Sequence, residues 1–261
     1  MKVSIVTINY NNANGLEKTI KSIIAHSTPL FEYIVIDGNS NDESKEILHH
    51  YANKISRWIS EPDSGIYNAM NKGIKIANGE YILFINSGDT LKEGIDFRKI
   101  IGHISNEDIV YFDLEIAGTG KSYIKKYPDS PDFKYFMDDT LPHTSSFIKK
   151  YVLKRYGYYS EKMNIASDWA FFTDCICLHN CTYKHINDCF STFYIDGISS
   201  QPDNRKLLWS ERDAHINAKY PLFYSLYKEW LEKKDELYNL KSSVRVRTLK
   251  KIGFLKWLKN E

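Results

Sequence analysis

The first third of the chain alternates short apolar runs with amphipathic segments, and this rhythm limits the possible folds most strongly. The apolar runs predict strands at Val3–Asn9, Phe31–Ile36, Ile55–Ser60 and Tyr81–Asn86. The segments between them predict helices at Asn14–Ala25, where Asn14 and Glu17 suggest a cap, Asp42–Tyr51 and Ile66–Ala77. Strands that alternate with helices at this spacing predict an α/β fold with a mostly parallel sheet flanked by helices.

The rest of the chain is less regular and predicts a smaller region followed by helices. The expected elements are a strand at Ile109–Leu114, a hairpin over Glu115–Tyr127 and a loop at Ser130–Asp139, then a strand at Thr144–Lys149, a helix from Asp168 to about His179 capped by Ser167, and strands at Thr182–Ile186 and Phe190–Tyr194. From Asp203 the pattern is helical. We therefore expect one domain over residues 1–202 and a helical extension over 203–261.

Composition excludes several classes of protein. The 261 residues are 43% hydrophobic and 26% charged, which is typical of a globular protein rather than a disordered one. The formal net charge of +2 argues against a protein that coats nucleic acid. No apolar run reaches the roughly 18 residues of a membrane-spanning helix, and the first residues suggest a buried strand rather than a signal peptide. These features predict a cytoplasmic protein.

Four cysteines gather near one another, at Cys175, Cys177, Cys181 and Cys189. They lie too close together in the sequence for disulfides between them to cross-link a domain of this size, which favours reduced thiols. A zinc site with His179 and His185 is the alternative. Because Cys175 and Cys177 fall on a predicted helix, where residues two apart point in nearly opposite directions, we favour buried thiols.

Acidic residues follow three of the predicted strands. Asp37, Asp63 and Asp89 recur at equal intervals, one βα unit apart, and Thr7 and Asn9 lie at the end of the first strand. Ligands of open α/β sheets bind outside the carboxyl ends of the strands, so these side chains are candidates for one binding site. The alternative is that strand-to-helix turns favour Asp as a cap or turn former.

Two of these acidic stretches suggest phosphate chemistry. In Ser87-Gly88-Asp89, a carboxylate at the end of an apolar strand can hold a hard divalent cation that bridges a diphosphate. In the Glu61–Gly73 stretch, a turn leads into a helix that carries Asn71 and Lys72, and Lys72 can reach a phosphate. The alternative readings are a plain turn and an amphipathic helix with a solvated lysine.

Together, the stretches Val3–Asn11, Tyr33–Asp42, Asp63–Gly73 and Gly79–Asp89 resemble the family 2 glycosyltransferases, which have the GT-A fold and use nucleotide-sugar donors. The resemblance implies that Thr7, Asn9 and Asp37 bind the nucleoside and that Asp63 lies near the base and ribose. It places the family's Asp-x-Asp motif on Ser87-Gly88-Asp89. A serine replaces the first acid, so Asp89 is the expected ligand of Mg²⁺ or Mn²⁺.

The resemblance extends to the second half of the chain. Asp168, in Ala166-Ser167-Asp168-Trp169, matches the acid that serves as general base in the family, and His143 matches a position on the acceptor side. Gly197–Ser200 is similar to a segment that closes near the diphosphate. An N-terminal helix charge and a buried histidine are the alternatives for Asp168 and His143.

The expected activity is that of an inverting glycosyltransferase. It would transfer a sugar from a nucleoside-diphosphate sugar to a hydroxyl of a saccharide or lipid-linked saccharide. The expected donor is a UDP-sugar. The family suggests synthesis of bacterial surface polysaccharide such as capsule or lipopolysaccharide. A Rossmann-type oxidoreductase is a poor fit, because residues 10–15 lack Gly-x-Gly-x-x-Gly. A non-catalytic module that binds a sugar nucleotide or a partner is the alternative.

The last residues, 241–261, combine seven lysines and arginines with apolar and aromatic residues, and their only acid is Glu261. Such a segment can lie on an anionic membrane surface, which would suit a lipid-linked acceptor. A helix that packs on the domain or on a second subunit explains the pattern equally well. The sequence leaves the oligomeric state open.

Overall fold

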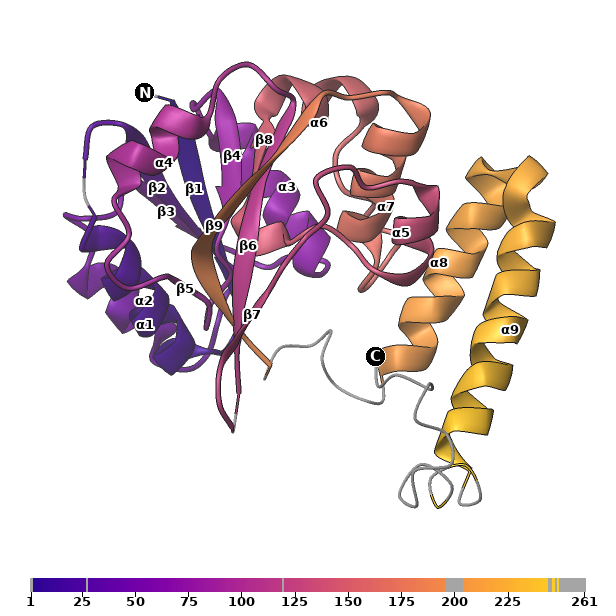
Figure 1. Cartoon of the computed structure of the whole chain (residues 1–261). Helices are drawn as coiled ribbons and strands as arrows, with labels where there is room; N and C mark the ends of the chain where they lie inside the picture. The colour runs from indigo at the N-terminus through magenta and orange to yellow at the C-terminus, as the bar shows by residue number, and fades with distance from the viewer. Residues whose placement is uncertain are drawn as a thin grey trace. The chain divides into compact units, whose positions relative to one another are not determined.

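The computed structural model describes residues 2–26, 28–118, 120–195 and 204–243, together with 246 and 248. The chain divides into two compact units, residues 1–211 and 212–261. In the first unit, the described strands form one sheet of nine strands in the order β3-β2-β1-β4-β8-β6-β9-β5, with β7 paired to β6 (Figure 1).

The amino-terminal half of the sheet is parallel, as the sequence predicts. It consists of β1 (Val3–Asn9), β2 (Phe31–Asp37), β3 (Arg57–Ser60) and β4 (Tyr81–Phe84). β1 pairs in parallel with both β2 and β4, and β2 pairs in parallel with β3. The carboxyl ends of all four strands therefore face one edge of the sheet.

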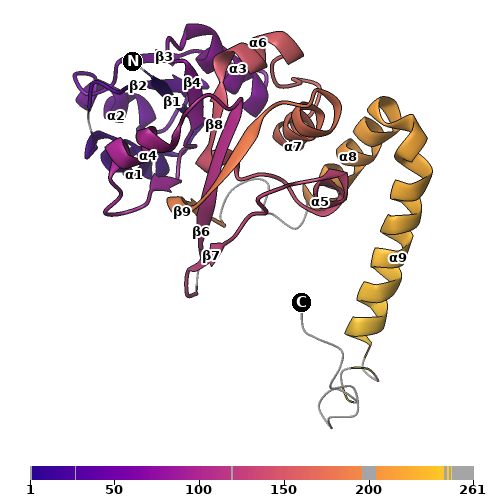
Figure 2. The same ribbon diagram turned by 45° about the horizontal axis from the view of Figure 1, so that its top comes forward.

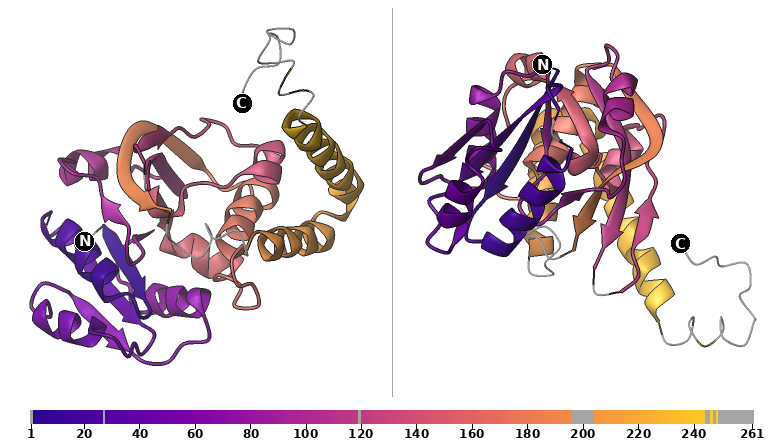
Figure 3. Two further views of the ribbon diagram at one scale, coloured as in Figure 1. Left: turned by 90° about the horizontal axis from the view of Figure 1, so that it is seen from below. Right: turned by 90° about the vertical axis from the view of Figure 1, so that its left-hand side faces the viewer.

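The second half of the sheet is mixed. β8 (Ser146–Lys149) runs antiparallel to β4 and to β6 (Ile109–Ala117), and β9 (Tyr183–Tyr194) runs parallel to β6. β5 (Thr90–Leu91) pairs with β9, and β7 (Tyr123–Lys125) forms the predicted hairpin with β6. The register of β9 shifts beside Asp113, and Figure 3 shows this strand in orange, curving along β6. A bulge of this kind bends a strand.

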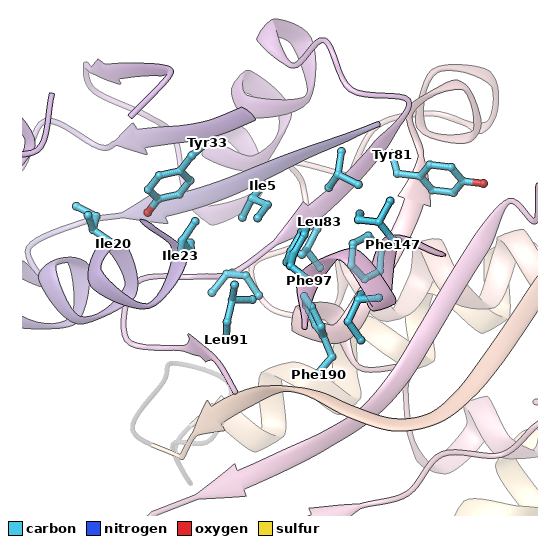
Figure 4. Packing of buried hydrophobic residues seen from close by; sticks show 14 of the residues in the cluster. Ile5, Ile20, Ile23, Tyr33, Tyr81, Leu83, Leu91, Phe97, Phe147 and Phe190 are labelled. Atoms are coloured by element: carbon cyan, nitrogen blue, oxygen red, sulfur yellow. The ribbon is translucent and has the colours of Figure 1, made fainter. Parts of the chain in front are cut away.

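Helices cover both faces of the parallel half, with α1 (Ala13–Ile24), α2 (Ser44–His50) and α4 (Phe97–His103) on one face and α3 (Ile66–Ile76) on the other (Figure 2). Alternate strand residues such as Ile5, Tyr33 and Leu83 join α1 and α4 in one apolar cluster (Figure 4). On the other face α3 packs closely. A Cβ on Gly73 would lie only 2.5 Å from Cγ1 of Val6.

Short elements complete the first unit: α5 (Phe133–Asp138), the 3₁₀ turn η1 (His143–Ser145), α6 (Lys150–Tyr156) and α7 (Ser167–Thr173), which continues as one π-helical turn, η2 (Asp174–Leu178). All four cysteines are free thiols, of which Cys175, Cys181 and Cys189 are buried.

Several sequence predictions were wrong in detail. Asn12, not Asn14, caps α1, because its side chain accepts the amide of Gly15. The expected loop at Ser130–Asp139 contains α5, whose cap is Asp132. The two short strands after Thr182 are the single strand β9, since the bulge hides its continuity in the sequence pattern.

The second unit contains the end of α8 (Arg205–Lys219), the 3₁₀ turn η5 (Pro221–Phe223) and α9 (Tyr224–Ser242). Asp213 of α8 accepts hydrogen bonds from the hydroxyl of Tyr224 and from Lys228 at 3.2 and 3.0 Å, which ties the two helices together. No helix in the described part of the chain combines the length and apolar character that a bilayer span needs.

Candidate active site

Backbone hydrogen bonds join the carboxyl ends of the parallel strands. The amide of Gly38 donates to the carbonyl of Asn9 at 2.9 Å, and the amide of Ser87 donates to the carbonyl of Ile8 at 3.1 Å. The loops that follow β1, β2 and β4 are thus held side by side. This is the edge where the sequence predicts a binding site.

Asp37 lies inside this edge and is fully buried. Its Oδ1 accepts the side-chain amide of Asn9 at 2.8 Å and the hydroxyl of Ser40 at 2.5 Å. Its Oδ2 accepts the amide of Ser40 at 3.0 Å and the hydroxyl of Ser60 at 2.6 Å. A carboxylate accepts about four hydrogen bonds. The protein therefore fills the acceptor sites of Asp37, which favours a structural role over the expected contact with a nucleoside.

Thr7 and Asn9 are also buried. The hydroxyl of Thr7 donates to the carbonyl of Ile85 at 2.7 Å and accepts the hydroxyl of Tyr33 at 3.1 Å, so both of its hydrogen-bonding roles are used inside the protein. Asn9 differs, because among the described residues no donor reaches its Oδ1. Of these two residues, only Asn9 keeps a polar atom without a hydrogen-bond partner among the described residues, and that atom is buried.

Asp63 lies at the surface of the same edge, beside the loop that follows β2. A Cβ on Gly38 would come within 2.7 Å of Oδ2 of Asp63 and 3.1 Å of the ring of Tyr10, so both side chains flank this glycine. Tyr10 follows β1 directly and is 67% exposed. A side chain at position 38 would collide with both, so glycine lets Tyr10 and Asp63 pack closely against this loop.

The turn after β4 holds Asp89 in a fixed position. Gly88 has a φ of 107°, a conformation that favours glycine, and its amide donates to the hydroxyl of Thr19 at 3.0 Å. The same hydroxyl donates to the carbonyl of Asp89 at 2.7 Å. Oδ1 of Asp89 accepts the amide of Tyr194 at 3.1 Å, which brings the end of β9 to this turn. The predicted closing segment Gly197–Ser200 lies outside the described residues.

Ser87 and Asn86 surround Asp89 in this turn. The hydroxyl of Ser87 donates to the carbonyl of Asn12 at 3.3 Å. Oδ1 of Asn86 is buried, and no donor in the described part of the chain reaches it. The described residues contain no group of three or more His, Cys, Asp or Glu side chains arranged for a metal. A cation here would therefore depend on Asp89, on neutral oxygens such as that of Asn86, and on oxygens of the substrate.

Asn71 and Lys72 of α3 are both engaged with the protein. The side-chain amide of Asn71 donates to the carbonyl of Tyr159 and to Glu161 at 2.9 and 2.8 Å, and its oxygen accepts the amide of Tyr159 at 3.1 Å. Lys72 forms an ion pair with Glu61 at 2.9 Å and donates to the carbonyl of Pro62 at 2.7 Å. These contacts favour roles in holding the loops around the site rather than the expected contact with phosphate.

Asp168 stands in the first turn of α7 and is half-buried. Its Oδ1 accepts the hydroxyl of Tyr67 at 2.9 Å. That hydroxyl in turn accepts the amide of Ser167 at 3.0 Å. Ser167 does not cap the helix as the sequence suggests. Its own hydroxyl instead accepts the amide of Ser160 at 2.6 Å, and Ala166 occupies the cap position.

His143 lies close to this group. Its ring stacks on Phe84 with centroids 4.9 Å apart, and its Nε2 lies 3.0 Å from the hydroxyl of Tyr159. Burial lowers the pKa of His143, and the negative charge of Asp168 opposes that shift only in part. The imidazole is therefore neutral at pH 7 and shares a hydrogen bond with Tyr159.

Glu211 of α8 supports the other side of α7. Its Oε2 accepts the amides of Ile165 and Ala166, both at 3.0 Å, and its Oε1 accepts the amide and the side-chain amide of Asn164 at 2.6 and 3.0 Å. A carboxylate at this place satisfies amides that precede the helix and complements the helix dipole. Glu211 thus fixes the segment that leads into Asp168.

A surface cavity of about 450 Å³ lies elsewhere, between α5 and the residues around η2. Its lining includes Asp132, Cys177 and Cys181 and contains none of the site residues expected from the sequence. Burial raises the pKa of the Cys177 thiol to about 12, so the thiol is protonated and weakly nucleophilic at neutral pH.

The sequence did not single out four residues that the structure places at this site: Tyr10, Tyr67, Asn86 and Glu211. Tyr10 and Asn86 lie in the stretches that resemble the family, next to residues for which the sequence predicts a role in the site. Tyr67 stands on the buried face of α3, where an aromatic residue is typical of a core. Glu211 carries no local signal, because its partners lie 45 to 47 positions away.

Comparisons with known proteins agree with this architecture. The model of the family "Glycosyl transferase family 2" matches residues 4–176. A Mycobacterium tuberculosis protein named as an uncharacterized glycosyltransferase is 30% identical over 177 residues, which cover 65% of this chain and 66% of that protein. A PGL/p-HBAD biosynthesis glycosyltransferase of the same species is 27% identical over 66% of this chain and 68% of its own length. The chain thus spans about two thirds of the length of these relatives.

Solved glycosyltransferase structures share the fold. S. aureus TarS 1-349 in complex with UDP-GlcNAc has a TM-score of 0.61 at 18% identity, covering 83% of this chain and 67% of that one. The mannosyltransferase PcManGT of Pyrobaculum calidifontis, in complex with GDP-Man and Mn²⁺, has a TM-score of 0.59 at 14% identity, covering 99% and 81%. The fold is the GT-A fold that the sequence predicts. On the extent of the family match, the chain belongs to glycosyl transferase family 2.

Proposed function

We propose that the chain transfers a sugar from a nucleoside-diphosphate sugar to an acceptor hydroxyl. The observation that carries this proposal is the link between two carboxylates through α3. Oδ1 of Asp63, at the strand edge, accepts the amide of Gly65 at 3.1 Å, and Gly65 caps the helix that carries Tyr67. Tyr67 then donates to Asp168. One short segment thus relates a donor-side acid to a candidate base.

The donor nucleoside would bind at this edge of the sheet, against Tyr10 and Asp63. The exposed ring of Tyr10 offers a face on which a base can stack, and Asp63 offers an acceptor for a base or ribose. A uridine donor is our first choice, because TarS was solved with UDP and with UDP-GlcNAc. The GDP-Man complex of PcManGT makes guanosine the second choice.

Asp89 would hold a divalent cation, Mg²⁺ or Mn²⁺, with the Oδ1 of Asn86 as a neutral second ligand. These oxygens fit a hard cation, which commonly takes one or two protein ligands and completes its shell with water and phosphate. When bound, such a cation neutralises the charge that grows on the leaving diphosphate. Thr19 and Tyr194 hold Asp89 at the turn in readiness for this ligand.

The transfer itself would be a single displacement that inverts the anomeric carbon. Oδ2 of Asp168, to which no protein donor in the described chain is assigned, would accept the proton of the acceptor hydroxyl. The hydroxyl oxygen would form its bond to C1 as the bond from C1 to the phosphate oxygen breaks, and the nucleoside diphosphate would leave. A positioned carboxylate is suited to this task because a sugar hydroxyl is a poor nucleophile at neutral pH. His143 would line the acceptor side.

The acceptor would be a saccharide or lipid-linked saccharide, and the setting the synthesis of a cell-surface polymer. One relative that is 36% identical over 95 residues is a putative teichuronic acid biosynthesis glycosyltransferase of Bacillus subtilis, covering 37% of that protein. The enzyme would act in the cytoplasm, and residues 241–261 would bring it to the inner membrane surface. Deleting these residues should weaken binding to anionic liposomes, more strongly at low salt. Equal binding by both forms would contradict the membrane role.

Release of nucleotide from a panel of UDP-sugars and GDP-mannose, with and without EDTA, tests the proposed activity. We expect turnover of at least one donor and its loss in EDTA. The alternative, a non-catalytic module that binds a sugar nucleotide, predicts donor binding without turnover under both conditions. Binding of UDP and GDP measured by calorimetry separates an inactive binder from a chain that binds neither nucleotide.

A further inference from the structure

We propose that Tyr67 is a positioning residue, which holds the carboxylate of Asp168 in the orientation that proton transfer requires. The inference rests on the proposed function of Asp168. Tyr67 stands in the first turn of α3, whereas Asp168 stands in α7, and their side chains meet at 2.9 Å across 101 positions of the chain. The contact is therefore a product of the tertiary fold.

The hydrogen bonds of the Tyr67 hydroxyl have a fixed direction. The amide of Ser167 can only donate, so the hydroxyl accepts there and turns its own proton toward Oδ1 of Asp168. Burial raises the pKa of Tyr67 well above its ordinary value, and the charge of Asp168 raises it further. The hydroxyl therefore stays protonated and continues to donate at neutral pH.

The surroundings prevent the Tyr67 ring from moving away. The side chain is 4% exposed, and its ring packs against that of Tyr159 with centroids 5.7 Å apart. The loop that carries Tyr159 is clamped to α3 by Asn71 and Glu161. The hydroxyl thus holds a fixed position at the start of α7.

In this arrangement the two carboxylate oxygens of Asp168 have different roles. Oδ1 is held by Tyr67, and Oδ2 has no assigned protein donor in the described part of the chain, which leaves it to receive the acceptor's proton. A bond that fixes Oδ1 also fixes the direction of Oδ2. A small displacement of a reacting group can cost about 100-fold in rate.

Replacement of Tyr67 by phenylalanine removes the hydroxyl and keeps the ring. With a donor that the wild type hydrolyses, we expect Y67F to lower kcat by about 10- to 100-fold. The KM for the donor and the binding of UDP should not change. The acid limb of the pH profile of kcat/KM should move to higher pH, because a hydrogen bond to the charged form of Asp168 has been lost.

A matched control is Y81F. Tyr81 is also fully buried, and its hydroxyl donates a single hydrogen bond, to the carbonyl of Glu107 at 2.8 Å, away from Asp168. Y81F should lower the melting temperature without moving the pH profile. If Y67F lowers only the melting temperature, or lowers kcat with an unmoved acid limb, Tyr67 is a packing residue and the inference is overturned.

A second variant covers the case in which Y67F does not fold. Site-specific incorporation of 3-fluorotyrosine at position 67 keeps the hydroxyl and makes it a stronger donor. It should move the acid limb in the opposite direction, to lower pH, and an unmoved limb would overturn the inference. Full activity of D168N would overturn this inference together with the role of Asp168 as base. An inactive D168N beside a wild-type-like Y67F would overturn the inference about Tyr67 alone.

Discussion

The carboxylate of Glu211 accepts the amide of Ala166 at 3.0 Å, so a residue of α8 supports the start of the helix that carries Asp168. We expect Glu211→Ala to lower the free energy of unfolding by about 1–2 kcal/mol, because it removes the acceptor for the part-buried amides of Ile165 and Ala166. It should also reduce turnover by loosening α7. Chemical denaturation and donor hydrolysis measure the two effects.

The control for Glu211 is Glu236→Ala. Glu236 pairs with Lys233 at the surface, where both side chains are about two-thirds exposed. Such pairs contribute little, so this variant should stay within about 0.5 kcal/mol of the wild type. Equal stability of the two variants would show that Glu211 does not hold α7.

Asp168→Asn should lower sugar transfer by about 10²- to 10⁴-fold, because the amide cannot accept the acceptor's proton. Donor binding should persist, since Asp168 lies on α7 and not on the loops that carry Asp63 and Asp89. Transfer is measured by nucleotide release and binding by calorimetry with UDP. Unchanged turnover would remove Asp168 from the mechanism.

Asp89→Ala should abolish the dependence of turnover on Mn²⁺ or Mg²⁺ together with most of the turnover itself. The reason is that Asp89 is the single carboxylate in the turn after β4. Titration of Mn²⁺ into wild type and variant, with turnover as the signal, measures this. Asn86→Ala should raise the Mn²⁺ concentration needed for half activity. If the wild type, Asp89→Ala and Asn86→Ala all needed the same Mn²⁺ concentration for half activity, the metal would bind elsewhere.

Asp37 and Asp63 should respond differently to the same substitution. Asp37→Asn places an amide against buried donors, so we expect a loss of at least about 2 kcal/mol in the free energy of unfolding. Asp63→Asn should leave stability within about 1 kcal/mol and weaken UDP binding, because Asp63 is partly exposed beside Gly38. Urea denaturation and calorimetry decide between them. The opposite pattern would make Asp37 the donor contact.

His143 should make the protein less stable in mild acid. Burial lowers its pKa in the folded state, so below about pH 6.5 the imidazole is protonated in the unfolded chain but still neutral in the native protein. The contribution of His143 to the free energy of unfolding is therefore fully present above that pH and falls as the pH drops toward the lowered folded pKa. Melting temperatures of wild type and His143→Gln between pH 5 and pH 8 should converge in acid. A constant difference would show that His143 does not titrate in this way.

The parallel half of the sheet could be predicted from sequence because its signals are local. A buried strand such as Val3–Asn9 is apolar along its own length, and the turns after it carry Gly and Asp for conformational reasons. The stretches from Val3 to Asp89 also carry the family resemblance. The family match and the shared fold confirmed the prediction for this half.

The tertiary structure alone decided which polar side chains face inward. Asp37 and Asp63 look alike in sequence, each an acid after a strand. Only the packing of Asn9, Ser40 and Ser60 around Asp37 fills its acceptor sites and leaves Asp63 at the surface. Likewise, Tyr67 and Glu211 meet the segment around Asp168 across long stretches of chain. Local sequence determines the elements, whereas hydrogen-bond partners depend on how distant elements pack, which no local pattern encodes.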